Sequence, residues 1–298
     1  MRQGDTAFLG HPRGLGWLSF SEAWERFSYY GMQALLVLYM THQLLQPGHV
    51  ENVLGFTPFR AFIESLYGPL SPEALASAIF GFYAGFVYLT PIGGGFLADR
   101  FLGRTNTVTI GAVLMALGHF LMAFDASFLL ALLCLLIGVG CFKGNIAAQV
   151  GDLYPPGDLR RADAFQIYIL GIQIAVIISP IACSTLAAVY GWHWGFGAAG
   201  VGMLIGLVIY LCGRPWLPPE PERRRKIAGP RPKLSAADWR SVLVLVALVP
   251  VLALSSVGNQ QIGNAYMIWA ENSMQMTFFG ITIPTPLARF RSIRSSAW

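Results

Sequence analysis

Seven long apolar stretches alternate with polar connections along this chain. They lie near residues 16–44, 73–98, 105–124, 127–149, 164–189, 194–213 and 241–270. Each stretch is long enough to cross about 30 Å of hydrocarbon as an α-helix. The pattern therefore predicts an all-α integral membrane protein with seven spans.

Two connections are longer than the others. Residues 45–72 are polar and contain Pro47, Pro58, Pro69 and Pro72, which predicts a partly helical outer loop. Residues 214–240 form a proline-rich basic linker without an apolar run. We therefore divide the chain into a six-helix transmembrane bundle (1–213), a cytoplasmic linker (214–240) and a seventh helix with its tail (241–298).

The composition supports the membrane interpretation. Of 298 residues, 55% are hydrophobic and 12% are charged, whereas a soluble domain carries about 25% charged residues. The formal charge of +5 comes mostly from arginines and lysines in short loops between the apolar stretches. A lipid bilayer is therefore the expected surroundings, and nucleic acid is not an expected partner.

The distribution of basic residues predicts the orientation in the membrane. With the amino terminus inside, almost all loop arginines and lysines are cytoplasmic, and Arg60 is the exception. The first apolar stretch carries charges and lacks a cleavage site, so it should act as an uncleaved signal anchor. Seven spans place the carboxyl terminus outside, although the last residues, ARFRSIRSSAW, contain three arginines.

The first stretch carries charges where a bilayer disfavours them. Glu22, Glu25 and Arg26 lie within SFSEAWERFSYYGMQALLVLYM, and at 100° per residue they share one half of the helix surface with Tyr29, Tyr30 and Gln33. A charge inside a membrane costs several kcal/mol and usually lines an ion or substrate path. This stripe predicts a helix with one face turned to a polar cavity.

A second charge inside the membrane is Lys143, in LLIGVGCFKGNIAAQVGDLY. Counted from the cytoplasmic side, Lys143 and Glu25 lie at matching depth, about 10–12 Å, and are expected to pair. Glu22, Glu25, Arg26 and Lys143 form a balanced set of two acids and two bases. Such a set suits proton coupling, and a static ion-pair lock between helices is the alternative.

The second stretch ends in GGGFLADRFLGRT. Its Gly95, Asp99, Arg100, Gly103 and Arg104 lie at the cytoplasmic boundary. Glycines let two helices approach closely, and Asp99 is expected to meet a helix amino terminus or an arginine. On their own, these arginines are equally consistent with simple orientation signals.

The sequence does not indicate an enzyme. It contains no nucleophile–base pair and no cluster typical of a metal site, and its four cysteines lack metal or redox spacing. No metal and no cofactor are expected.

Three motifs resemble those of a known family. The run from Gly95 to Arg104 is similar to the signature of the major facilitator superfamily. Glu22-x-x-Glu25-Arg26-Phe27-x-Tyr29-Tyr30-Gly31 resembles the hallmark of the proton-dependent oligopeptide transporter (POT) family within it. Phe142-Lys143-Gly144-Asn145 resembles the fourth-helix motif of that family, with glycine in place of proline.

The resemblance implies roles for particular residues. Glu22, Glu25 and Arg26 would couple proton and substrate binding together with Lys143. The peptide-binding residues would be Tyr29, Tyr30, Gln33, Tyr88, Gln173 and Asn259, and the conformational gate would be the Gly95–Arg104 motif.

Several positions depart from the family pattern. Gln33 stands where arginine is frequent, Gln173 where asparagine is usual, and Asn259 near a frequent glutamate of the seventh helix. Asn259 cannot bind a proton at neutral pH, so coupling would depend more on Glu22 and Glu25. Tyr88, taken alone, is equally consistent with a packing tyrosine.

The resemblance also implies a fold and a function. The superfamily fold has two six-helix bundles around a central cavity, so the chain is expected to be truncated after its seventh helix, with the carboxyl-terminal bundle missing. The implied function is symport of di- and tripeptides with protons across the inner (cytoplasmic) membrane, driven by the proton gradient. The alternative is a nonfunctional or interaction-only fragment, and a second copy or the missing half would be a partner.

Overall fold

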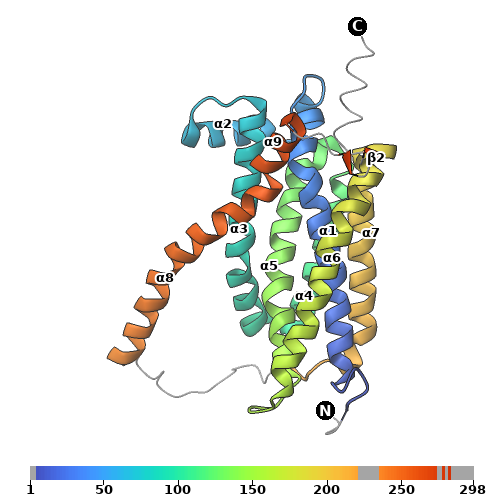
Figure 1. The fold of residues 1–298 in the computed structure, drawn as a ribbon. Coiled ribbons are helices and arrows are strands. Elements are labelled where there is room, and N and C mark those ends of the chain that lie inside the picture. Colours follow the sequence, from blue (N-terminus) through green and yellow to red (C-terminus); the bar gives the residue numbers. More distant parts are fainter. Residues whose placement is uncertain (1–4, 221–234, 274–276, 279–280, 283–298) are drawn as a thin grey trace.

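The structure is a computed structural model that describes residues 5–220, 235–273, 277–278 and 281–282 (Figure 1). Its long helices are α1 (Arg13–Tyr39), α2 (Phe56–Tyr67), α3 (Pro72–Leu97), α4 (Arg104–Leu121), α5 (Phe128–Asp152), α6 (Arg160–Tyr190), α7 (Trp192–Gly213), α8 (Ala236–Gln260) and α9 (Ala265–Ser273). Short helical turns are η1 (Met40–Leu44), η2 (Val50–Asn52), η3 (Ala98–Leu102), η4 (Asp125–Ser127), η5 (Arg214–Trp216) and η6 (Gln261–Gly263). Two short strands, β1 (Thr277–Phe278) and β2 (Ile281–Thr282), pair as an antiparallel hairpin.

Six helices form one bundle, as the sequence predicts. Helix α1 packs against α6 and α7, while α5 packs against α3 and α4, and α4 also meets α7. Large apolar side chains such as Leu36, Phe142 and Phe196 are fully buried between them. Since α1 has neighbours on several sides, most of its length is buried, including its polar stripe.

Five helices in the described part of the chain are long and apolar enough to cross a membrane: Pro72–Leu102, Asp125–Asp152, Arg160–Tyr190, Trp192–Trp216 and Asp238–Gly263. The predicted spans 16–44 and 105–124 are not among them, although they fold as α1 and α4 of the same bundle. Helix α1 contains four charged residues, and α4 has 18 residues. These features make α1 less uniformly apolar and α4 shorter than the other long helices of the bundle. Both helices nevertheless pack within the bundle.

The seventh predicted span is wrong as a single helix. Helix α8 starts at Ala236, inside the predicted linker, and ends at Gln260; a short turn and Asn264 then separate it from α9. Asn264 has φ −127° and ψ −101°, which interrupts the helix. Most of α8 is exposed, and it runs obliquely away from the bundle (orange in Figure 1). The predicted outer loop 45–72 contains η2 and α2.

Glycines set the closest helix contacts. A Cβ atom added to Gly94 of α3 would collide with the backbone of Gly140 in α5, and a Cβ atom on Gly111 of α4 would lie 2.7 Å from the Gly138 carbonyl oxygen of α5. Because no Cβ atom approaches so closely without displacement, glycine is required at these crossings. Helix α5 is therefore held tightly against both α3 and α4, which fixes the position of Lys143.

The linker closes the arginine-rich end of the bundle. The backbone N–H groups of Arg104 and Thr105 donate to the Glu220 carboxylate, at 2.8 and 2.7 Å. The N-cap residue Gly103 has φ +79°, and a side chain there would meet this carboxylate at 2.9 Å. Glu220 therefore caps α4 from a segment that follows α7.

The Glu220 carboxylate has a lowered pKa. Partial burial acts to raise this pKa, but the hydrogen bonds from the Thr105 side chain and from the backbone of Thr105 and Arg104 outweigh it. The ionised form is therefore favoured in the folded protein. Its contribution to stability is present above the pKa of the unfolded chain and is lost as pH falls through the lowered pKa.

Substitution of Gly94 tests the helix crossing. We expect Gly94→Ala to destabilise the bundle by about 1–3 kcal/mol, because the added methyl group forces α3 away from α5. Gly81→Ala on the same helix is the control, because its Cβ atom meets nothing within 4 Å. Thermal unfolding in detergent is the measurement, and equal midpoints for the two variants would contradict the argument.

Substitution of Glu220 tests the cap of α4. We expect Glu220→Gln to lower the free energy of unfolding by about 1 kcal/mol at neutral pH. The difference in this free energy between the variant and wild type should become smaller as pH falls. The control is Glu73→Gln, in the first turn of α3, where Ser71 accepts the cap hydrogen bond from the backbone of Ala74. A pH-independent difference between Glu220→Gln and wild type would rule out the carboxylate as the cause.

Candidate functional site

A buried charged cluster lies on α1. The Arg26 Nε is 3.2 Å from Glu22 Oε1, one helical turn away, and also forms an ion pair with Glu25. The three residues are only 1–4% exposed. The structure thus brings Glu22, Glu25 and Arg26 together as the sequence predicts, within a single helix.

Not every polar atom of this cluster is paired. Among the described residues, Glu22 Oε2, Glu25 Oε1 and Arg26 Nη2 have no hydrogen-bond partner. Burying a polar atom without a partner is costly, so such atoms in a native structure need an explanation. In this conformation the three atoms are shielded from solvent, and the Tyr168 hydroxyl is a polar neighbour of the Glu22 carboxylate.

The predicted pairing of Lys143 with Glu25 is wrong in this conformation. Within the described part of the chain, Lys143 forms no ion pair, and its Nζ lies 5.1 Å from the centroid of the Tyr88 ring. Arg26 already occupies both acids from the same helix, so Lys143 is left to a cation–π contact with α3. Glu22 and Glu25 attract this ammonium group electrostatically, although neither forms an ion pair with it.

Aromatic side chains surround the charges. The Arg26 guanidinium lies 5.2 Å over the Tyr29 ring, and the Tyr29 and Tyr30 rings meet edge to face at 5.2 Å. Two buried tyrosines of this site were not predicted from the sequence: Tyr168 of α6, which interacts with Glu22, and Tyr83 of α3, whose hydroxyl has no described partner. A polar residue inside an apolar stretch was the available signal for both.

The end of α8 meets the bundle beside this site. Gln260 Nε2 donates to the Tyr88 hydroxyl at 2.6 Å, and a Cβ atom on Gly263 would lie 3.2 Å from Gln33 Nε2. The structure therefore brings Gln33 and Tyr88 close to the break between α8 and α9. The predicted binding residue Asn259 is on α8, but its side chain lies outside the described residues; Gln173 is exposed on α6.

The predicted gate residues lie at the arginine-rich end of the bundle. Gly95 lies in the last turn of α3. The π-helical turn η3 follows α3, contains Asp99 and Arg100 and leads into Gly103. Arg104 forms an ion pair with Asp152, which joins α4 to α5. The carboxylate that meets the amino terminus of α4 belongs to Glu220, so this expectation for Asp99 is wrong; Asp99 forms no ion pair with a described residue.

No group of metal-ligating side chains occurs in the described segments. The cysteines Cys134, Cys141, Cys183 and Cys212 are free thiols. The chemistry that this site offers is therefore proton exchange on carboxylates and the pairing of charged groups by Arg26 and Lys143.

The chain is similar to proteins of known family. Residues 105–233 match the family described as PTR2, POT family. The chain is 39% identical over 212 residues to the peptide transporter YePEPT of Yersinia enterocolitica, which covers 70% of this chain and 38% of that protein. It is 35% identical over 251 residues to a di-/tripeptide transporter of Lactococcus lactis, which covers 83% of this chain and 46% of that protein.

Solved structures agree with the sequence matches. A peptide transporter POT in complex with sulfate has a TM-score of 0.68 and 28% identity, over 96% of this chain and 66% of that one. A POT family transporter in complex with a thioalcohol-conjugated peptide has a TM-score of 0.66 and 27% identity, over 97% of this chain and 68% of that one. The chain spans less than half the length of the two curated relatives above. With its six-helix bundle and these matches, the chain matches the POT family model through residues 105–233 and shares the fold of POT transporters.

Proposed function

We propose that this chain provides the proton-coupling and peptide-binding part of a symporter for di- and tripeptides. The observation that carries the proposal is the buried cluster of Glu22, Glu25 and Arg26. Both acids of this cluster attract the membrane-embedded Lys143 without forming an ion pair with it. The curated relatives described as peptide transporters support the choice of substrate.

Proton binding has a direct effect on this cluster. A proton on Glu25 or Glu22 removes one of the two negative charges that hold Arg26, so the guanidinium becomes available to another anion. In a low-dielectric site this change in charge has a large effect on the interaction energy between the remaining charges. Protonation and substrate binding are therefore linked, and a proton gradient can drive uptake without any cofactor.

A small peptide presents the complementary charges. Its carboxylate can pair with Lys143, and its amino group can meet a carboxylate oxygen of Glu22 or Glu25. The rings of Tyr29, Tyr30 and Tyr88 border the same region and offer surfaces to side chains of varied shape. Recognition through the two termini requires few specific contacts with the side chains of the peptide. This mode of binding fits a transporter of many di- and tripeptides.

The proposed location is the inner (cytoplasmic) membrane with a cytoplasmic amino terminus. The described arginines Arg13, Arg104, Arg160 and Arg214 all lie at helix ends on the side of the bundle that holds the amino terminus (Figure 1). A concentration of arginine in short loops marks the cytoplasmic side. The gate residues Asp99 to Arg104 would then face the cytoplasm.

A second candidate is a membrane protein that interacts but does not transport by itself. The exposed apolar surface of α8 favours this alternative. Proteoliposomes that hold this chain alone, with an inward proton gradient and labelled dialanine outside, separate the two candidates. We expect little or no accumulation; robust concentrative uptake would show that this length is sufficient for transport.

Proton coupling is tested by the pH dependence of binding. We expect Glu25→Gln to remove the dependence of dialanine affinity on pH, because the cluster then loses a group that exchanges a proton. The measurement is calorimetry from pH 5 to 8 in two buffers of different ionisation enthalpy. The same substitution should abolish proton-driven uptake wherever uptake is observed.

A surface carboxylate provides the control for that experiment. Glu64→Gln replaces a carboxylate on α2 that pairs with Arg60 at 3.0 Å, away from the cluster. This variant should keep the pH dependence of wild type. If Glu25→Gln also keeps it, Glu25 is not the coupling group.

The role of Lys143 is tested by removing its charge. We expect Lys143→Gln to weaken dialanine binding about tenfold or more, since a charge-assisted pair is lost. Binding of a carboxyl-amidated dipeptide should change little, because that ligand has no carboxylate. An equal loss for both ligands would assign Lys143 a purely structural role.

A further inference from the structure

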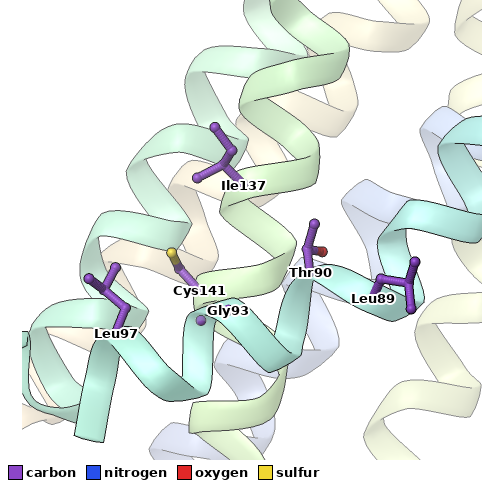
Figure 2. A pocket seen from close by; sticks show the side chains of 7 residues that line it. Leu89, Thr90, Gly93, Leu97, Ile137 and Cys141 are labelled. Carbon is purple, nitrogen blue, oxygen red and sulfur yellow. The ribbon is translucent and has the colours of Figure 1, made fainter. Parts of the chain in front are cut away.

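A groove runs between α3 and α5 on the outside of the bundle. Its lining residues are Leu89, Thr90, Gly93, Gly94, Leu97, Ile137 and Cys141, and its volume is about 380 Å³ (Figure 2). Helices α3 and α4 both pack closely on α5 but have few contacts with each other. A strip of α5 therefore remains uncovered between them.

The groove opens away from the charged cluster. Cys141 and Lys143 are two residues apart on α5, so their side chains point about 200° apart around the helix axis. Cys141 also faces α4, since a Cβ atom on Gly111 would lie 3.0 Å from the Cys141 Cβ atom. The groove is thus on the side of α5 away from Lys143, and its apolar lining residues Leu89 and Ile137 are exposed.

The groove has free space next to one glycine of α3. A Cβ atom on Gly93 would meet nothing within 4 Å, whereas a Cβ atom on the adjacent Gly94 would collide with α5. Gly94 is therefore explained by helix packing, but Gly93 is not. The space above Gly93 is bordered by the apolar side chains of Leu89, Leu97 and Ile137, as Figure 2 shows.

A positive charge lies beyond one end of the groove. Leu89, Gly93, Leu97 and Arg100 fall on one face of α3 and its continuation η3, with Arg100 about one turn past Leu97. The Arg100 guanidinium lies 5.6 Å over the Phe96 ring, and it forms no ion pair within the described segments. An arginine at the end of an apolar span lies at the level of the lipid headgroups.

We propose that this groove binds an acyl chain of an anionic phospholipid, with the lipid phosphate at Arg100. The apolar lining suits a hydrocarbon chain, the missing side chain at Gly93 provides its space, and Arg100 is the cation that a phosphate requires. A zwitterionic lipid can place an acyl chain in the same groove, but it presents no net negative charge to Arg100. The site is separate from the proposed peptide site, so its test does not depend on transport.

The proposal is tested by native mass spectrometry of the purified chain in detergent with equimolar phosphatidylglycerol and phosphatidylcholine. We expect wild type to retain phosphatidylglycerol about fivefold more than phosphatidylcholine, the preference that one arginine near a membrane surface provides. Gly93→Leu fills the groove and should lose both bound lipids. Arg100→Gln should keep bound lipid but lose the preference for phosphatidylglycerol.

The control is Gly81→Leu, which adds the same side chain to α3 at another position where a Cβ atom meets nothing within 4 Å. It should retain lipid like wild type. Phosphatidylglycerol with a photoreactive acyl chain gives a second readout on the wild-type protein. Its crosslinks should concentrate on residues 89–97 and 137–141, even if Gly93→Leu fails to fold.

Three results would overturn the proposal. The first is equal lipid retention by wild type and Gly93→Leu, and the second is labelling spread evenly over the outer surfaces of α4, α6 and α7. The third is a wild-type dimer without bound lipid that Gly93→Leu converts to monomer, because the groove would then be occupied by a second copy of the chain.

Discussion

The burial of two carboxylates and a guanidinium on one turn of α1 is the constraint on which the rest of this structure depends. Charges in a low-dielectric interior are tolerated only when they are paired, and removal of one partner from a buried pair costs about 3–5 kcal/mol. Arg26 satisfies Glu22 and Glu25 only in part, since an oxygen of each remains without a described partner. The surrounding helices supply Tyr168 and Lys143, which compensate part of the cost of burying these charges.

Helix α5 links the charged site to the rest of the bundle. Glycines on both of its neighbours bring α3 and α4 to backbone contact with it, so Lys143 cannot move far without moving those helices. The same close packing leaves the strip of α5 that floors the lipid groove. One helix therefore carries the charge of the proposed peptide site on one side and a surface for the bilayer on the other.

Much of the fold could be predicted from the sequence, because apolar periodicity and length determine where a chain crosses a membrane. The six bundle helices lie within a few residues of the predicted stretches. The break between α8 and α9 was not predicted, although the polar run GNQQIGN at residues 258–264, which ends in glycine and asparagine, was an available signal for it.

The site could be predicted only in part, because helical spacing follows from the sequence but packing between helices does not. Helical spacing brought Glu22, Glu25 and Arg26 to one face, but equal depth in the membrane was not enough to pair Lys143 with Glu25. A partner on the same helix is held in place by the backbone, whereas a partner on another helix depends on the packing angle between the two. Glu220 lies in a proline-rich linker, and no local pattern indicates that its carboxylate reaches the start of α4 across more than a hundred residues.

The contact between Glu220 and α4 has a consequence for biosynthesis. The ribosome produces α4, α5, α6 and α7 before Glu220 emerges, so the first turn of α4 stays uncapped while four helices enter the membrane. The contact can form only after Glu220 has been synthesised, when all six helices of the bundle already exist. Its formation marks completion of the amino-terminal bundle, and a translation arrest before residue 220 leaves a membrane intermediate with that helix end exposed to chaperones and proteases.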